Sequence, residues 1–523
     1  MTAAAAERFG DRPAIVDGDV RLSYVELVEA ARTFGAALVA SGVAAGDRVA
    51  IWLPNGVEWV IAVLGLFEAG AVLVPVNTRF KGAEAAEVLS RSRARVLVTV
   101  TDFLGNDYVA MLRSTGAALH DLGTTVVARG AAPPDAVTWN AFVARATPEG
   151  RTGAGRRGAA AGPGDPSDIL FTSGTTGRPK GVVKTHAGTL RVALDWVAMT
   201  ELTAGDRYLM VNPYFAMFGL NAGILASVAA GATMLPQAVF DVDRVLARVA
   251  EERVTVLPGP PTLYQAILAH PDRARYDLSS LRVAVTGSAE IPVELIRRMH
   301  DELPFSTIIA GYGLTEGGTV SSTSRGDDFE TIAKTIGRPR PGYEVRVVDE
   351  HDVDVPRGEA GEFLVRGPSV MVHYLDDREG TARALSPDGW LRTGDLGLVN
   401  EAGCLKIVGR KKDMFVVGGF NAYPAEIENA LLCHPGIQQA AVIGVPDERL
   451  GEVAMAFVVL RPGTRLTGAD VVEWSRREMA NYKVPRAVEV VDELPLNATG
   501  KVLKDVLRER AARARPAAAG ATR

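Results

Sequence analysis

The sequence contains little cysteine, little histidine and no large excess of either charge. Of its 523 residues, 2 are cysteines and 7 are histidines. Two cysteines, Cys404 and Cys433, cannot form the disulfide framework of a small secreted domain, so we expect a reducing cytoplasm. The histidines are scattered singly, without the spacing of metal ligands, which argues against a structural metal site. The formal net charge of −5 provides no basic surface, so we expect no nucleic-acid partner.

The sequence also lacks a signal peptide and a membrane-spanning run. Met1 to Gly10 has neither the basic region nor the apolar core of a signal peptide. The longest apolar run near the N-terminus, Trp59 to Phe67, lies between Glu58 and Glu68 and is shorter than the roughly 20 residues that a transmembrane helix needs. We therefore predict no integral membrane segment. The length and the 47% hydrophobic content indicate a globular chain of more than one domain.

Strand-like and helix-like segments alternate through the N-terminal part of the chain. Ser23 to Glu26 matches a capping box, which predicts a helix that ends near Gly42. Further strands are expected at 48–53, 72–75, 96–100, 208–211, 232–235 and 254–257, and further helices at 57–69, 217–230 and 242–251. This alternation predicts an α/β fold of βαβ units with largely parallel sheets.

The alternation of strands and helices ends near Tyr343. Short strands at 344–348, 362–366 and 404–408 predict a small β-rich subdomain. After a charged break at 409–413, a compact α+β pattern predicts a small C-terminal domain with helices at 424–433 and 468–482 and strands at 440–445 and 453–460. We therefore predict an N-terminal domain at 1–411 and a C-terminal lid domain at 412–523. Residues 151–164, rich in Gly, Ala and Arg without periodicity, are predicted to form a mobile linker in the large domain.

The most informative stretch is Asp168 to Lys184, with the sequence DILFTSGTTGRPKGVVK. An apolar run, Ile169 to Phe171, predicts a buried strand that leads into a loop of glycine and hydroxyl residues. Such a loop suits phosphate, because glycines let backbone N–H groups approach an anion, hydroxyls add donors and Lys180 adds a charge. The loop is not a Walker A motif, because Pro179 precedes the lysine and Gly181 follows it.

Four more motifs accompany this loop, in the order TGSAE at 286–290, GYGLTE at 311–316, DGWLRTGD at 388–395 and PLNATGK at 495–501. The ordered set resembles the signature of the adenylate-forming superfamily, which contains acyl-CoA synthetases, luciferases and peptide-synthetase adenylation domains. The resemblance extends from about Asp11 to about Arg508. It implies that the protein activates a carboxylic acid with ATP through an acyl-adenylate, with ATP and Mg²⁺ as cofactors and CoA as the expected cosubstrate.

The resemblance also assigns roles to particular residues. Glu316 and Thr172 are expected to hold Mg²⁺, which favours carboxylate and phosphate oxygens together. Asp395 is expected to accept both ribose hydroxyls, because a carboxylate offers two acceptor oxygens. Lys501 is expected to stabilise the charge that builds up at the substrate carboxylate and the α-phosphate. Catalysis is thus expected to depend on Lys501, Thr172 and Glu316.

The remaining expected nucleotide and CoA contacts follow the same motifs. Tyr312 is expected to stack on adenine, Arg410 to assist at the ribose or phosphate, and Lys412 to act as the hinge of a domain rotation. That rotation would present Gly418 and Gly419 to the pantetheine of CoA. The complete set is Thr172, Ser173, Gly174, Thr175, Thr176, Gly177, Lys180, Gly287, Ser288, Ala289, Gly311, Tyr312, Gly313, Thr315, Asp395, Arg410, Lys412, Gly418, Gly419 and Lys501.

The segment PYFAMFG at 213–219 matches the substrate-pocket motif of the superfamily. The predicted pocket residues are Tyr214, Phe215, Ala216, Phe218, Gly219 and Gly287. Amino-acid-activating relatives have aspartate at the position of Ala216 to pair with the substrate amine. A free α-amino acid is therefore not expected, because its buried ammonium group would have no partner.

Acyl-CoA ligases usually have histidine at the position of Ala216. The sequence therefore leaves two possibilities for the nucleophile that accepts the activated group, CoA or a different molecule. One interpretation is an acid–CoA ligase, because the stretches at 256–262 and 418–424 resemble actinobacterial-type ligases of ring-bearing acids from steroid breakdown. The other is an adenylating enzyme of secondary metabolism with a different acceptor, such as an enzyme that activates nitrite for attack by an aromatic amine. A nucleotide-binding module without catalysis is disfavoured, because Lys180, Glu316 and Lys501 are all present. A small-molecule acid is the expected partner, and a homodimer is compatible with the sequence.

Overall fold

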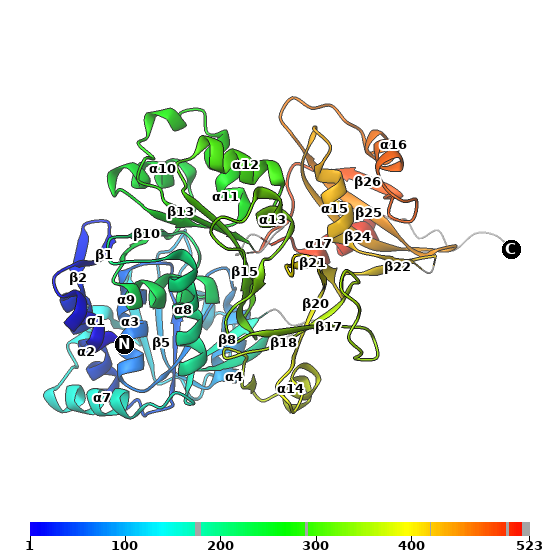
Figure 1. The fold of residues 1–523 in the computed structure, drawn as a ribbon. Helices are drawn as coiled ribbons and strands as arrows, with labels where there is room; N and C mark the ends of the chain where they lie inside the picture. The colour runs from blue at the N-terminus through cyan, green and yellow to red at the C-terminus, as the bar shows by residue number, and fades with distance from the viewer. Residues whose placement is uncertain (173–178, 288–290, 419, 498–500, 515–523) are drawn as a thin grey trace.

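The computed structural model describes residues 1–172, 179–287, 291–418, 420–497 and 501–514. Figure 1 shows a large N-terminal part in blue to green, a small sheet in yellow, and a C-terminal domain in orange to red beside them. The N-terminal part contains two large sheets with helices packed between and around them. The predicted α/β class with largely parallel sheets is confirmed.

The first large sheet has eight strands and carries the phosphate-loop motif. Its inner strands are parallel, as expected for βαβ units, and two antiparallel strands close one edge. In order across the sheet the strands are β19 (His373–Tyr374), β9 (Lys180–Thr185), β8 (Pro166–Thr172), β4 (Val72–Pro75), β3 (Arg48–Trp52), β5 (Ala94–Val100), β6 (Thr124–Arg129) and β7 (Val137–Thr138).

The second large sheet has nine strands and carries the motifs at 286–290 and 311–316. In order they are β16 (Arg338–Pro339), β15 (Gly318–Ser322), β14 (Thr307–Leu314), β13 (Val283–Gly287), β12 (Val256–Pro258), β10 (Arg207–Met210), β11 (Thr233–Pro236), β1 (Pro13–Asp17) and β2 (Val20–Ser23). The strands from β14 to β1 are parallel, and β15, β16 and β2 are antiparallel edges.

Two long helices cross closely beside these sheets. Helix α2 (Tyr24–Ala40) begins at the predicted capping box of Ser23 and Glu26, and α3 (Val57–Glu68) packs against it. They meet at two glycines, since a Cβ on Gly35 would lie 2.6 Å from the carbonyl oxygen of Gly65. The other N-terminal helices are α1 (Thr2–Phe9), α4 (Gly82–Ser92), α5 (Tyr108–Arg113), α6 (Trp139–Val143), α7 (Pro148–Ala160), α8 (His186–Thr200), α9 (Ala226–Ala230), α10 (Val242–Glu251), α11 (Pro261–Ala269), α12 (Val293–Glu302), α13 (Phe329–Lys334) and α14 (Arg378–Ala384), with a 3₁₀ turn at Arg273–Arg275.

The predicted β-rich subdomain is a four-stranded antiparallel sheet. Its strands are β17 (Glu344–Val348), β18 (Gly361–Arg366), β20 (Leu391–Val399) and β21 (Leu405–Arg410). After a turn at 411–413 the chain enters a separate sheet of β22 (Phe415–Val417), β23 (Phe420–Ala422), β24 (Ile437–Asp447), β25 (Gly451–Leu460) and β26 (Ala487–Val490), with helices α15 (Pro424–Leu432), α16 (Gly468–Glu478) and α17 (Lys504–Ala514). These elements have an apolar core of their own, which includes Phe415 and Phe457. The predicted boundary at residue 412 falls in the connecting turn.

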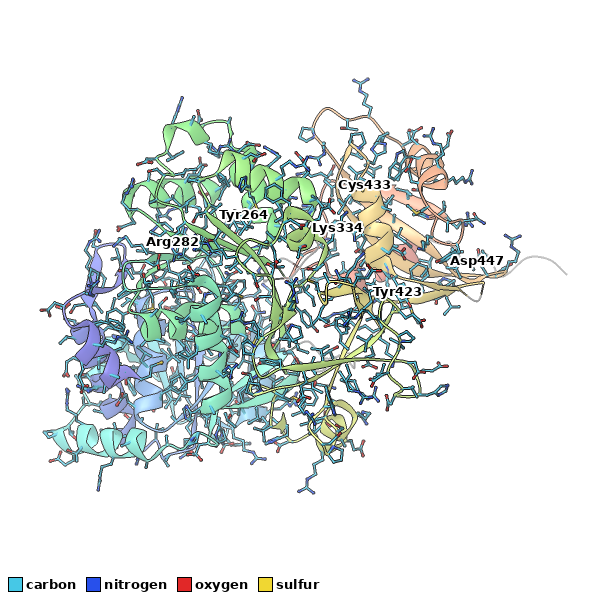
Figure 2. The ribbon with its side chains drawn as sticks, in the orientation of Figure 1. Tyr264, Arg282, Lys334, Tyr423, Cys433 and Asp447 are labelled. Carbon is cyan, nitrogen blue, oxygen red and sulfur yellow. The ribbon has the colours of Figure 1, made fainter. Side chains whose placement is uncertain are left out.

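Both cysteines are free thiols in different parts of the molecule. Cys404 is buried beside β21, whereas Cys433 is exposed at the end of α15, where Figure 2 labels it. Neither lies in one of the five motifs.

Two stretches differ from the sequence-based expectations. Most of the predicted linker at 151–164 is helix α7, which begins at the N-cap Thr147 with Pro148 in its first turn. Two of its glycines are needed for packing, because a Cβ would lie 2.6 Å from the carbonyl oxygen of Ala36 on Gly150 and 2.9 Å from that of Glu68 on Gly158. The predicted helix at 217–230 begins as a π-helix, Phe218–Leu225, before α9. Thr147 followed by Pro148 is typical of a helix start and could have indicated α7. The segment has too few apolar residues to show a helical period, so the helix was not predicted.

Candidate active site

The phosphate-loop motif joins β8 to the antiparallel strand β9. Thr172 and Lys180 are partners across the two strands, so they stand at the two ends of the loop, and both are half-buried. Ile169 and Leu170 are buried in the sheet and fix the strand that leads into the loop. The predicted residues Ser173, Gly174, Thr175, Thr176 and Gly177 lie outside the described residues.

The GYGLTE motif forms a hairpin rather than a loop. Strand β14 continues through Leu314, and β15 returns beside it. Gly287, at the end of β13, pairs with Gly311, and a Cβ on Gly287 would lie 2.6 Å from the carbonyl oxygen of Gly311. A Cβ on Gly313 would meet the carbonyl oxygen of Gly318 at 2.5 Å. Gly287 and Gly313 are therefore required for close backbone packing. Ser288 and Ala289 lie outside the described residues.

Asp395 is held by two neighbours, Tyr312 and Arg410. Asp395 and Arg410 are cross-strand partners in β20 and β21, and Arg410 Nε lies 2.9 Å from Asp395 Oδ1. The Tyr312 hydroxyl, from the other sheet, donates a hydrogen bond to Asp395 Oδ2 at 2.5 Å. Loss of hydration around the phenol and the negative charge of Asp395 raise the pKa of Tyr312, so it stays a donor. The structure therefore assembles three residues that the sequence assigned to the nucleoside.

Glu316 has a partner that the sequence analysis missed. The Tyr374 hydroxyl donates a hydrogen bond to Glu316 Oε1 at 3.0 Å, and Lys180 Nζ lies 4.6 Å from the centre of the Tyr374 ring. Burial and the charge of Glu316 raise the pKa of Tyr374. Strand β19, which carries Tyr374, has two residues, and only its pairing with β9 brings it to the phosphate loop. No motif in the sequence indicated this contact.

Lys501 reaches the site from the C-terminal domain. Its backbone is held by Asn497, whose amide oxygen accepts a hydrogen bond from the Lys501 N–H at 2.9 Å. Although Lys501 is exposed as a residue, loss of hydration around its ammonium group and the positive charge of Arg410 lower its pKa, while Asp395 and Glu316 act in the opposite direction. The side chain thus lies within the electrostatic field of the other motif residues.

The predicted substrate-pocket residues differ in burial and in the groups that they contact. Tyr214 is fully buried, with its hydroxyl 3.0 Å from the sulfur of Met210. Phe218 packs edge-on against Trp196, with ring centres 5.1 Å apart. Ala216 is half-buried, and Gly219 lies too close to the carbonyl oxygen of Pro213 to carry a side chain.

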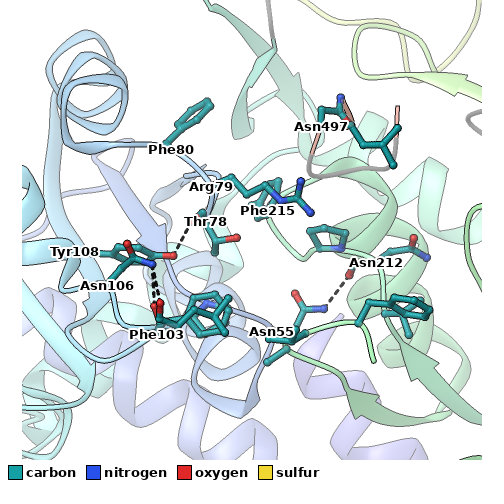
Figure 3. Close-up of a pocket in the computed structure, with 18 of the residues that line it drawn as sticks. Asn55, Thr78, Arg79, Phe80, Phe103, Asn106, Tyr108, Asn212, Phe215 and Asn497 are labelled. Atoms are coloured by element: carbon teal, nitrogen blue, oxygen red, sulfur yellow. Dashed lines mark hydrogen bonds between the residues drawn. The ribbon is translucent and has the colours of Figure 1, made fainter. Parts of the chain in front are cut away.

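Phe215, as predicted for a pocket residue, lines a cavity, which has a volume of about 500 Å³. In Figure 3, Tyr108 and Phe103 of the lining lie on the left and Asn212 on the right, with Arg79 and Phe215 close together in the centre and Asn497 of the C-terminal domain above them. Its lining also includes Phe80, Lys81, Phe240 and Leu496. The cavity therefore combines basic and aromatic side chains of the N-terminal domain with Leu496 and Asn497 of the C-terminal domain.

Hydrogen bonds and ring stacking hold the residues of the cavity wall in place. The Tyr108 hydroxyl donates to the carbonyl oxygen of Thr78 at 2.6 Å, and the Tyr108 ring stacks on Trp52 with centres 4.2 Å apart. Asn55 donates to the carbonyl oxygen of Asn212 at 2.9 Å. The cavity is thus a preformed pocket, as small-molecule sites usually are.

The donor set suits a magnesium ion that arrives with phosphate. Glu316 offers a carboxylate oxygen and Thr172 a hydroxyl oxygen, which are hard ligands of the kind that Mg²⁺ prefers. Within the described ranges, no group of three or more His, Cys, Asp and Glu side chains forms a complete cage. Mg²⁺ usually keeps waters and substrate phosphates as its other ligands. The residues present therefore fit a metal held jointly by the protein and a nucleotide.

The other predicted positions lie near the domain junction. Lys412 is exposed in the turn at 411–413. Gly418 is exposed with a positive φ of 57°, which favours glycine, and Gly419 lies outside the described residues. The role of Lys412 as a hinge stays a prediction.

A buried lysine, Lys184, lies beneath the site. It is the cross-strand partner of Asp168, and the two residues are 3% and 1% exposed. Burial lowers the pKa of Lys184 from 10.5 to about 8, and the charges of Asp168 and Glu316 oppose this shift. Burial raises the pKa of Asp168.

The lowered pKa of Lys184 predicts a pH-dependent stability difference. Between about pH 8 and 10.5 the unfolded lysine holds a proton that the folded lysine has lost, so this group makes the fold more stable as the pH rises. The free energy of unfolding of the wild type should therefore gain about 2 kcal/mol between pH 8 and 10 relative to Lys184→Met. Urea unfolding of both proteins at several pH values measures this difference. Parallel pH profiles would contradict the prediction.

The converging nucleotide motifs and the two-domain α/β fold define an AMP-forming adenylating enzyme. The sequence pattern of the AMP-binding enzyme family matches residues 2–375, and that of the AMP-binding enzyme C-terminal domain matches residues 426–501. The chain therefore belongs to the AMP-binding enzyme family.

Within this class, the chain is similar to proteins that are named as CoA ligases. A Rhodococcus jostii protein named 3-[(3aS,4S,7aS)-7a-methyl-1,5-dioxo-octahydro-1H-inden-4-yl]propanoyl:CoA ligase is 48% identical over 509 residues, which cover 97% of both chains. A Mycobacterium tuberculosis protein of the same name is 49% identical over 506 residues, covering 95% of this chain and 96% of its own. The solved structure of an anthranilate CoA ligase with bound anthranoyl-AMP matches with a TM-score of 0.87 at 29% identity, covering 98% of this chain and 97% of the other.

These comparisons bear on the predictions from sequence. The predicted superfamily and the predicted class, an AMP-forming ligase of the acid–CoA ligase type, are confirmed. The alternative with a non-CoA acceptor is not favoured. None of the helices in the described part of the chain has the length and apolar character needed to span a bilayer.

Proposed function

We propose that the protein activates a bulky, ring-bearing carboxylic acid by adenylation and transfers the acyl group to the thiol of CoA. The observation that carries this proposal is the pair of relatives at 48% and 49% identity over nearly the whole chain, both named as ligases of a fused-ring propanoyl group. The acid proposed here is accordingly an alicyclic propanoic acid of the kind formed in steroid breakdown.

The first step joins the acid to AMP. A carboxylate oxygen attacks the α-phosphorus of ATP, a new P–O bond forms, and the bond to pyrophosphate breaks. The enzyme contributes mainly by positioning the reactants and neutralising charge. In our proposal the loop from Thr172 to Lys180 contacts the phosphates, and Lys501 approaches the reacting carboxylate and α-phosphate. Mg²⁺, held by Glu316 and Thr172, would neutralise phosphate charge when bound.

We assign the binding of the nucleoside part of ATP to Tyr312, Asp395 and Arg410. Tyr312 would stack on adenine, and Asp395 would accept the ribose hydroxyls with Arg410 beside it. Support comes from the contacts of Tyr312 and Arg410 with the carboxylate of Asp395, a residue that is 3% exposed. A preformed cluster binds a ligand without a further cost of ordering its side chains.

The second step transfers the acyl group. The CoA thiol, as thiolate, attacks the acyl carbonyl carbon, and AMP leaves with the electrons of the broken anhydride bond. The cavity lined by Arg79, Lys81 and Phe80 is the proposed CoA site, because cationic side chains suit its phosphates and aromatic rings suit its adenine. Rotation of the C-terminal domain about Lys412 would withdraw Lys501 and present Gly418. The thiol belongs to CoA, so neither cysteine of the protein takes part.

The acceptor can be tested by measuring pyrophosphate release with MgATP and a panel of acids, with and without CoA. The panel contains aliphatic, aryl and alicyclic carboxylates, and nitrite together with an aromatic amine. We expect a single burst of about one pyrophosphate per enzyme without CoA, because the acyl-adenylate stays bound, and sustained turnover with CoA. The alicyclic propanoates should give the highest rate, and mass spectrometry should detect their acyl-CoA products.

A different result would redirect the proposal. If CoA leaves the rate unchanged while nitrite and the amine are consumed, Ala216 marks a changed acceptor. If CoA sustains turnover best with aryl or aliphatic acids, the ligase stands and the alicyclic substrate does not.

Two further proposals concern the setting of the enzyme. The two free cysteines support a reducing cytoplasmic location. A homodimer is the proposed assembly, and light scattering during size-exclusion chromatography would measure its mass.

A further inference from the structure

Lys184 is a buried cation that connects three segments of the site. It lies on β9, opposite Asp168 of β8, and is 3% exposed. Its Nζ donates a hydrogen bond to the carbonyl oxygen of Thr315 at 3.2 Å and another to the carbonyl oxygen of Ser369. Thr315 immediately precedes Glu316, and Ser369 lies shortly before β19. One side chain therefore ties the metal-binding turn and the β19 segment to the strand that follows the phosphate loop.

The β19 segment is also tied directly to Glu316. The Met371 N–H donates to the carbonyl oxygen of Glu316 at 2.7 Å, and the Tyr374 hydroxyl donates to Glu316 Oε1 at 3.0 Å. On its other side, the Leu375 N–H donates to the carbonyl oxygen of Gly181 at 2.7 Å, next to Lys180. Glu316 is thus held at its backbone and its carboxylate by a segment that is fastened to the phosphate-loop strand.

The charge of Lys184 has no evident packing purpose. Burying an ammonium group is costly unless nearby groups compensate it, and an apolar side chain of similar volume often stabilises a fold equally well. Here the compensation comes from two backbone carbonyls and from the carboxylates of Asp168 and Glu316. Asp168 is itself fixed by the hydroxyls of Ser167 and Thr189, at 2.6 and 2.7 Å. The fold therefore retains a costly cation where its donors fix the turn that carries Glu316.

We propose that Lys184 and Tyr374 are positioning residues that orient the Glu316 carboxylate toward a metal ion held with the nucleotide phosphates. This inference rests on the proposed metal role of Glu316. Partners that orient a metal-binding carboxylate typically contribute 10–100-fold to metal affinity. Tyr374 fixes one carboxylate oxygen and leaves the other available, while Lys184 fixes the backbone from which the carboxylate extends.

The structure offers a matched control in Tyr343. Its hydroxyl donates to the carbonyl oxygen of Gly317 at 2.9 Å, so it supports the same turn one residue away, but its bond goes to the backbone and not to the Glu316 carboxylate. Tyr374→Phe and Tyr343→Phe each remove one phenolic hydroxyl from one hydrogen bond to this turn. Any difference between them reports on the carboxylate contact.

The test measures metal binding without catalysis. Mn²⁺ binding to the full-length protein is followed by electron paramagnetic resonance with α,β-methylene-ATP, which the enzyme cannot split at the α-phosphate. We expect Tyr374→Phe and Lys184→Met to weaken Mn²⁺ binding about 10–100-fold. Tyr343→Phe should stay within about twofold of the wild type, and nucleotide binding in EDTA should be unchanged in all variants.

Several results would overturn the inference. Unchanged Mn²⁺ affinity in Tyr374→Phe, or an equal loss in Tyr343→Phe, removes the specific role of the carboxylate contact. If Lys184→Met does not fold, Tyr374→Phe still decides. A wild type that binds the nucleotide but no Mn²⁺ would refute the metal role of Glu316 itself. A wild type that binds both but activates no acid would overturn the proposed function and leave this inference intact.

Discussion

Replacing Lys501 with alanine is expected to lower acyl-adenylate formation about 10²–10³-fold, the scale of losing one preorganised charge donor. The ammonium group lies in the field of Arg410, Asp395 and Glu316 and is the part of the C-terminal domain that is proposed to meet the reacting groups. Pyrophosphate release with a saturating acid measures the first step. Thioester formation from synthetic acyl-adenylate and CoA measures the second, which should change less than about fivefold, because Lys501 is proposed to have withdrawn by then.

The second half of this experiment separates a catalytic role from a structural one. Lys504, three residues further on, pairs with Glu428 at 2.8 Å within the C-terminal domain, so Lys504→Ala is the control. It should leave adenylation close to the wild-type rate. An unchanged rate of pyrophosphate release in Lys501→Ala would refute the proposed role. An equal loss in both half-reactions would show that the substitution disturbs the domain rather than the first step.

Replacing Asp395 with alanine is expected to remove the preference for a ribose over a deoxyribose. Both carboxylate oxygens are already oriented, by Tyr312 and Arg410, in a buried position. A site built around a hydroxyl group rejects an analogue that lacks it, because the buried acceptor is left unpaired. The wild type should therefore prefer ATP to 2′-deoxy-ATP by roughly 10–100-fold in kcat/KM, and Asp395→Ala should use both equally poorly.

This prediction has a structural control in Asp206. Asp206 is also buried, and it pairs with Arg282 at 2.8 Å. It directly precedes Arg207, the first residue of β10 in the second large sheet. Asp206→Ala should lower stability but keep the preference for ATP. If Asp395→Ala retains the preference between the two nucleotides, the ribose is bound elsewhere. If Asp206→Ala also loses it, the effect of Asp395→Ala reports on stability alone.

The sequence by itself determined the adenylation chemistry, but not the acceptor, and most of the local structure. Local rules made this possible: the capping box at Ser23 begins α2, alternating apolar segments give strands and helices, and the motif glycines are needed where backbones approach closely. Five motifs in a fixed order indicated the family, because the ordered set resembles the signature of the superfamily far more specifically than any single motif does. The same local reasoning failed at 151–164, since the glycines of α7 fit tertiary contacts rather than a linker.

Only the tertiary structure decided which distant residues meet. The contacts of Lys184 with Ser369 and of Tyr374 with Glu316 join segments 185 and 58 residues apart, and no periodicity encodes them. The same holds for the cavity, whose lining combines Arg79 with Asn497 of the other domain. The physical reason is that strand register and packing between domains place these side chains, whereas a sequence pattern reports on its own strand or loop. The sequence therefore determined the adenylation step and left the acceptor open, and the fold determined how the acidic and basic groups of the site are oriented.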